Sequence, residues 1–268
     1  MNPRVSGRGR WWLALLAAGL YGFLYLPLAV VVVFSFNLAQ HGLAWQGWTL
    51  DWYRRLLADD LALAAARNTL VLGAASTALA TVLGTALALG LHRLGPLTRQ
   101  RAQRLLQVPI FIPDIVMAAA MLLFYALARR WLGLFELGLG TMILAHVTFQ
   151  VPFVTLVVGA RLTGLDPALE EAARDLGATP GRAFRHVTLP LILPGVLAAA
   201  MLALTLSLDD FVVSFFTSGP GTTTVPILIY SSVKRGVTPE INALATVLVL
   251  GSLLATLGAV LLRRRGTG

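Results

Sequence analysis

The chain has 268 residues, of which 57% are hydrophobic and only 12% are charged, and its formal net charge is +9. A soluble domain of this length carries about 25% charged residues, so the composition excludes an ordinary soluble protein and predicts a polytopic helical membrane protein. Arginine marks the cytoplasmic side of such a protein, and the positive charge therefore does not indicate a nucleic-acid partner. The sequence has no cysteine, which excludes disulfides and thiol chemistry.

Six apolar runs are each long enough, at roughly 20 residues or more, to cross a hydrocarbon core of about 30 Å. They cover residues 11–36, 68–92, 105–128, 139–160, 189–216 and 241–262. We expect an all-α membrane domain over 11–262, with short tails at 1–10 and 263–268. Six spans put both termini on one side, and a cytoplasmic N-terminus places 14 of the 21 basic residues on the inner side, which is the usual bias.

Several kinds of chemistry have no signal in the sequence. The single lysine, Lys234, follows Val233, so there is no glycine-rich phosphate loop through which the chain could bind ATP. The four histidines are scattered, and none pairs at a metal-ligand spacing. No nucleophile motif is present either. We therefore expect no catalytic residue, no cofactor and no metal ion.

A charged and sharply punctuated loop joins the fourth apolar run to the fifth. Asp166 and Pro167 are typical of a helix start, and Gly177 is typical of a helix stop. Thr179 followed by Pro180 predicts a second short helix. The loop could be a solvated amphipathic segment, or it could be a rigid knob that fits a socket on another protein. The spacing alone leaves both interpretations open.

The stretch Leu165–Val196 resembles the EAA loop of permease subunits in binding-protein-dependent ABC importers, the MetI-like family. The matching residues are Glu171, Ala172, Ala173, Gly177, Leu189 and Pro190. Val187 stands where isoleucine is usual. The resemblance implies a type I importer permease whose coupling loop, residues 161–188, docks into a groove of a cytoplasmic ATPase. It also implies that Glu171 faces the ATPase, that Gly177 makes the bend, and that both termini are cytoplasmic in a bacterial inner membrane.

Three acidic residues, Asp114, Asp209 and Asp210, lie inside the expected spans, where no lysine or arginine is available to pair with them. A carboxylate in a bilayer costs several kcal/mol unless it is paired or hydrated, so it is a functional candidate. Adjacent helical residues point about 100° apart, so we expect one acid of the pair at a substrate pathway and the other against a neighbouring helix. Alternatively, the pair could cap broken backbone near Gly219, and Asp114 could cap a helix after Pro113.

Trp45 lies in the loop 37–67, which also contains Trp48, Trp52 and Tyr53. Aromatic groups of this kind are common at membrane interfaces. They could instead form an aromatic face at a pore entrance, because such faces stack on cations.

Two further stretches, Ser207–Pro220 and Tyr230–Ala243, resemble the spermidine/putrescine branch of the family, as do Pro113–Val116 and Trp45–Thr49. The resemblance favours the second permease subunit of that branch. It implies a non-identical second permease, an ATPase dimer, an external solute-binding protein and a polyamine substrate, for which acidic and aromatic linings are suitable. Importers of aminoethylphosphonate, thiamine or ferric iron share much of the pattern and stay open as alternatives, as do an ATP-independent channel and a membrane enzyme.

Overall fold

A computed structural model describes the backbone of residues 7–39, 44–234, 236 and 238–265. Side chains are described for 11–39, 44–234, 236 and 238–254, so the side chains of the two expected tails, 1–10 and 263–268, lie outside the described residues. Over the described residues the regular structure is helical, apart from one isolated antiparallel bridge between Asn37 and Trp48.

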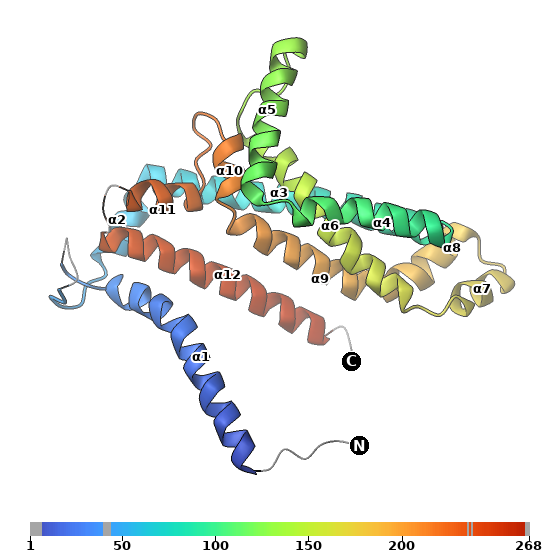
Figure 1. Ribbon diagram of the computed structural model, residues 1–268, viewed down its shortest axis with the longest axis horizontal. Coiled ribbons are helices and arrows are strands. Elements are labelled where there is room, and N and C mark those ends of the chain that lie inside the picture. Colours follow the sequence, from blue (N-terminus) through green and yellow to red (C-terminus); the bar gives the residue numbers. More distant parts are fainter. Residues whose placement is uncertain (1–6, 40–43, 235, 237, 266–268) are drawn as a thin grey trace. The chain divides into compact units, whose positions relative to one another are not determined.

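The helices follow one another along the chain as labelled in Figure 1. Their bounds are α1 Gly7–Phe34, α2 Asp51–Ala58, α3 Asp60–His92, α4 Pro96–Phe111, α5 Asp114–Leu132, α6 Leu139–Thr163, α7 Ala168–Asp175, α8 Pro180–Ala183, the π-helical turn η1 Phe184–Thr188, α9 Leu189–Leu208, α10 Val212–Thr217, α11 Val225–Val233 and α12 Pro239–Arg265.

Five described helical segments are long and apolar enough to cross a membrane. They are Trp11–Phe34, Asp60–His92, Asp114–Leu132, Leu139–Thr163 and Pro180–Leu208. In α12 the part with described side chains is the shorter apolar segment Pro239–Leu254. The all-α membrane fold expected from the sequence is therefore confirmed.

Two of the expected spans are interrupted by helix breaks. The range 105–128 is divided between α4 and α5, because Pro113 lacks an N–H and disfavours helical dihedrals at the residue before it; Ile112 has φ −73° and ψ 130°. The range 189–216 is divided between α9 and α10, with the break at residues 209–211. Long apolar runs lie on both sides of each break, so a hydropathy pattern averaged over a span does not register them.

The chain divides into two compact units, and each is described by itself. The first unit comprises Met1–Leu63 and Ile229–Leu250, and the second comprises Ala64–Leu228 and Gly251–Gly268. In the first unit the buried side chain of Asn37 fixes the loop after α1, because its Nδ2 donates to the Ala44 carbonyl (2.8 Å) and its Oδ1 accepts from the Gln46 N–H (2.9 Å). The indole N–H of the buried Trp52 donates to the Asn37 carbonyl at 2.8 Å.

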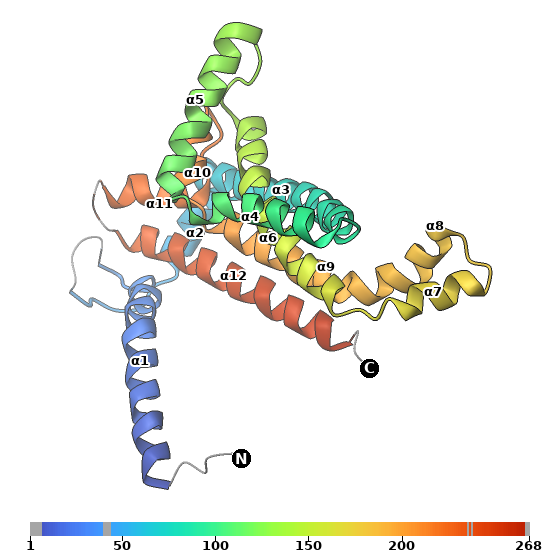
Figure 2. The same cartoon turned by 45° about the vertical axis from the view of Figure 1, so that its right-hand side comes forward.

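The core of the second unit lies where α6 and α9 run side by side, as Figures 1 and 2 both show. Val154, Val158, Ile192 and Ala199 are completely buried there. Helix α3 joins this core through small residues, which let helix backbones approach closely in a membrane. At Gly84 an added Cβ would lie 2.6 Å from the Val154 Cβ and 3.1 Å from the Val151 carbonyl oxygen.

The Gly84→Ala variant tests this close approach. Because the Val154 side chain and the Val151 backbone would have to shift, we expect the free energy of unfolding to fall by about 1–3 kcal/mol, measured as a lower melting temperature in detergent. Gly90→Ala is the matched control on the same helix, since an added Cβ there meets nothing within 4 Å. Equal melting temperatures for the two variants would contradict the packing of α3 on α6.

Candidate functional site

The loop between α6 and α9 contains two short helices, and local side-chain chemistry starts and stops them. The Asp166 carboxylate accepts the Ala168 N–H at 3.0 Å at the start of α7. Gly177 follows the end of α7 with φ +84°, a conformation that favours glycine. The Thr179 hydroxyl then accepts the Arg182 N–H at 3.4 Å, with Pro180 at the first position of α8. These are the start, stop and second start expected from the sequence.

The second short helix continues into the membrane helix without a corner. Thr188 and Leu189 both have right-handed helical dihedrals, and Pro190 lies in the first turn of α9, directly after the π-helical turn η1. The residues Pro180–Leu208 therefore form one continuous helical segment. A displacement of α8 would consequently be transmitted directly to α9.

Glu170 holds the two arms of the loop together. Its Oε1 accepts from Arg174 Nη2 at 2.6 Å, and its Oε2 accepts from the Thr188 hydroxyl at 3.2 Å. The first contact lies within α7, and the second joins α7 to η1. Since both carboxylate oxygens are engaged inside the loop, Glu170 acts as a brace between its two helices.

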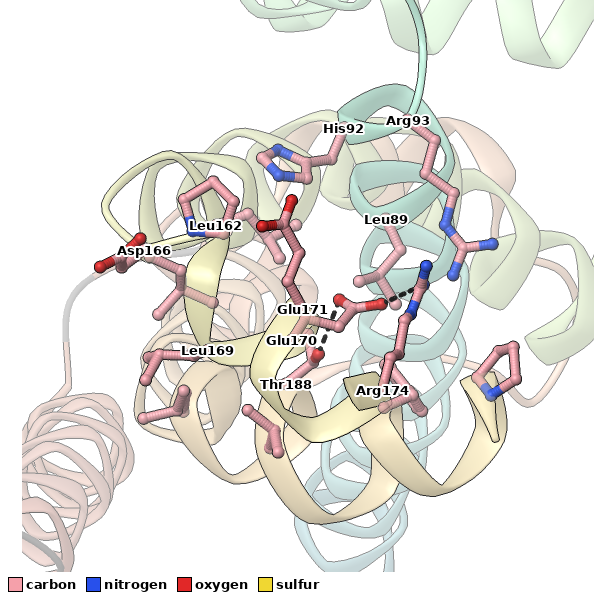
Figure 3. A pocket seen from close by; sticks show the side chains of 16 residues that line it. Leu89, His92, Arg93, Leu162, Asp166, Leu169, Glu170, Glu171, Arg174 and Thr188 are labelled. Atoms are coloured by element: carbon pink, nitrogen blue, oxygen red, sulfur yellow. Dashed lines mark hydrogen bonds and ion pairs between the residues drawn. The ribbon is translucent and has the colours of Figure 1, made fainter. Parts of the chain in front are cut away.

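Glu171, the next residue, is exposed, and its carboxylate has no hydrogen bond or ion pair with another described residue. Figure 3 shows its carboxylate turned toward the end of α3 that carries His92. Both glutamates line a cavity of about 550 Å³ bounded by α7, η1 and the ends of α3 and α6, with Arg93 also in its wall. Of the two glutamates, Glu171 is the one available to a partner.

The other sequence-predicted matches lie close by in the same loop. Ala172 is exposed on α7, Ala173 is half-buried there, and Leu189 and Pro190 open α9. The loop therefore presents a charged helix braced against the base of a membrane helix. It lies at one end of α9 and the 209–211 break lies at the other, as Figure 2 shows. A 20-residue α-helix is about 30 Å long, which is close to the thickness of a hydrocarbon core.

At the break, the Asp210 carboxylate is hydrogen-bonded to other groups of the protein. Its Oδ1 accepts the Val213 N–H at 3.3 Å and its Oδ2 accepts the Ser214 N–H at 2.7 Å, so this carboxylate caps the start of α10. His146 on α6 places Nε2 3.3 Å from Oδ2. The His146 side chain is fully buried, and the Asp210 side chain is 11% exposed.

From the sequence only lysine and arginine were expected as partners for the intramembrane acids, and His146 was missed. A signal was available: His146 and Gln150 are four residues apart on one face of an apolar helix, where polar side chains require partners. Asp210 does cap broken backbone, as one of the two interpretations expected, but it does so at another position. The carboxylate caps α10 rather than the backbone near Gly219.

Asp209 differs from its neighbour. Its side chain is exposed, and it has no hydrogen bond or ion pair to another described side chain. Asp114 is likewise exposed, at the first residue of α5, with no such contact among the described residues. Trp45, in the first unit, is 41% exposed and its ring lies 4.9 Å from that of Trp48 and 6.1 Å from that of Phe34. The described residues hold no cluster of three or more His, Asp or Glu side chains suited to a metal ion.

Residues 80–265 match the family described as the binding-protein-dependent transport system inner membrane component. The chain belongs to this family. The permease is 42% identical to the putrescine transport system permease protein PotI of Escherichia coli (strain K12), over 94% of the chain and 90% of the relative. It is 40% identical to the spermidine/putrescine transport system permease protein PotC of the same strain, over 92% of each.

A solved bacterial ABC transporter involved in the import of the acidic polysaccharide alginate has the same fold. Its matching chain superposes on the permease with a TM-score of 0.77 at 22% identity, over 95% of both chains. The protein is thus a multi-pass inner-membrane permease of an ABC importer, and its relatives are transport permeases rather than enzymes.

Proposed function

We propose that this permease forms, with a second and non-identical permease subunit, the pathway through which an ABC importer takes up polyamines such as putrescine and spermidine. The observation that carries the proposal is the identity of 40–42% over more than nine-tenths of the chain to permeases named for these substrates. The alignments cover 92–94% of the chain, so the likeness includes both the coupling loop and the α9–α10 break.

The charges of the second unit support a cationic substrate. Two carboxylates lie at the α9–α10 break, and Asp114 opens α5. Helix α5 packs against α10. Polyamines are flexible polycations, which acidic side chains in a low-dielectric surrounding attract strongly. The exposed Trp45 in the first unit offers an aromatic face of the kind that binds cations. We assign Asp209, Asp210, Asp114 and Trp45 to the pathway.

The loop at the other end of α9 supports coupling to a separate ATPase dimer. Glu171 is exposed while its neighbour Glu170 braces the loop, so a docked ATPase would meet a rigid surface with a free carboxylate. Ala172 and Ala173 allow close approach, Gly177 makes the bend, and Leu189 and Pro190 carry movement into α9. Docking to a cytoplasmic ATPase would place this loop and both termini in the cytoplasm, with a solute-binding protein on the opposite side.

Uptake by the complete importer in proteoliposomes tests the substrate. We expect ATP-dependent accumulation of labelled putrescine or spermidine at least about tenfold above that of 2-aminoethylphosphonate and thiamine, because the acidic residues favour a polycation. Vesicles with a non-hydrolysable nucleotide serve as the control. Accumulation of one of the other solutes alone would contradict the polyamine assignment, and accumulation without nucleotide hydrolysis would contradict the coupling.

The Glu171→Ala variant tests the coupling loop. We expect ATP-driven uptake to fall at least about tenfold, since a free carboxylate that meets the ATPase is removed, while membrane insertion stays normal. Asp175→Ala is the matched control, because it removes an exposed carboxylate from the same short helix. If the two variants transport equally well, Glu171 does not meet the ATPase.

A further inference from the structure

The buried polar side chains near the break form one continuous chain across α3, α6, α9 and α10. Gln150 Nε2 lies 3.4 Å from Ser76 Oγ, and Ser76 Oγ lies 3.3 Å from Ser207 Oγ. Ser207 Oγ lies 2.7 Å from His146 Nδ1. His146 Nε2 then faces Ser214 Oγ at 3.0 Å and Asp210 Oδ2 at 3.3 Å. Except for the slightly exposed Asp210, every side chain in this series is at least 98% buried.

The two ends of the chain fix the direction in which its protons point. Gln150 Nε2 lies 2.9 Å from the Ala203 carbonyl, which can only accept a hydrogen bond, so this atom must be the amide nitrogen. The amide therefore donates at one end of the chain. Each oxygen of the Asp210 carboxylate already accepts a backbone N–H group, so Asp210 is the acceptor at the other end.

Each hydroxyl between these ends therefore accepts a hydrogen bond from one neighbour and donates one to the next. Gln150 donates to Ser76, Ser76 donates to Ser207, and Ser207 donates to Nδ1 of His146. A ring that accepts at Nδ1 carries its proton on Nε2, where it faces Ser214 and Asp210. In a doubly protonated ring Ser207 would have to accept from Nδ1–H. Its own proton would then have no acceptor among the described contacts, or it would turn to Ser76 and leave the Ser76 proton only the Gly73 carbonyl at 3.5 Å. The geometry thus points to a neutral His146 with Nε2–H.

This assignment separates the roles of the two adjacent acids. Asp210 receives donors from Val213, Ser214 and His146, and these replace the water that a buried carboxylate has lost. Asp209 has no described side-chain partner and is exposed. The neutral ring adds no positive charge near the break, so it holds Asp210 without cancelling the attraction of Asp209 for a cation.

We propose that His146 is a positioning residue of the transport pathway. By donating from Nε2 it keeps Asp210 on the start of α10, and so presents Asp209 as the carboxylate that meets the cation. This inference rests on the proposed function, because it takes the substrate to be a cation that passes the break.

The test compares His146→Gln with His146→Leu in the complete importer. The quantity measured is the initial rate of ATP-driven uptake, with the substrate-loaded binding protein at a saturating concentration. Like the neutral ring, the glutamine amide offers an acceptor for Ser207 and a donor for Asp210, so we expect a rate within about threefold of the wild type. Leucine leaves a buried acceptor without its donor, and we expect a loss of about tenfold or more. Basal ATP hydrolysis and the yield of assembled complex report whether each variant folds.

A double-variant cycle shows whether His146 acts through Asp209. We expect Asp209→Asn to lower uptake, and His146→Leu to lower it little further in the Asp209→Asn background, because interacting residues give non-additive effects. A purely structural role would lower uptake by the same factor in both backgrounds. If His146→Leu does not assemble, Ser207→Ala replaces it in the cycle, since it keeps the ring and removes the hydroxyl that donates to Nδ1 and accepts from Ser76.

Three results would overturn the inference. His146→Gln as slow as His146→Leu would mean that the ring must be charged. His146→Leu as fast as the wild type would mean that it positions nothing, and additive losses would mean that it does not act through Asp209. Failure of the proposed function shows separately, because the wild-type importer would then take up thiamine rather than polyamine. In that case the variants are compared by their rates of thiamine uptake.

Discussion

A carboxylate inside an apolar membrane protein is stable only where protein groups replace the water it has lost. Asp210 meets this requirement with two N–H groups from the start of α10 and with the buried ring of His146. The same contacts hold α9, α10 and α6 in a fixed relation, since Ser207, Ser214 and His146 belong to these three helices. The helix break, the placement of Asp209 and the proposed cation pathway all depend on this one carboxylate.

The coupling loop is organised in a similar way at the opposite end of α9. Adjacent residues on a helix point about 100° apart, so the neighbouring acids Glu170 and Glu171 of α7 face different surroundings. Glu170 braces α7 against η1, and Glu171 is left exposed. Asp210 caps α10, and Asp209 is left exposed. In each pair one carboxylate stabilises local structure, and its neighbour is available to a partner or a substrate.

The sequence predicted most reliably what neighbouring residues determine. Helical membrane segments follow from composition, and the bend at Gly177 and the cap at Thr179 follow from the conformational chemistry of those residues. Prediction from the sequence failed where the side chains in contact belong to different helices. The contact between His146 and Asp210 joins residues far apart in the chain, and hydropathy does not encode it. The break before Asp114 was signalled by Pro113, but the apolar run on both sides concealed it.

The most direct measurement is an experimental structure of the assembled importer with a polyamine trapped in the membrane pathway. The account predicts an ammonium group of the polyamine against the Asp209 carboxylate, while Asp210 stays on the N–H groups of α10 and on His146. A polyamine held by Asp210, with His146 turned away from that carboxylate, would contradict it.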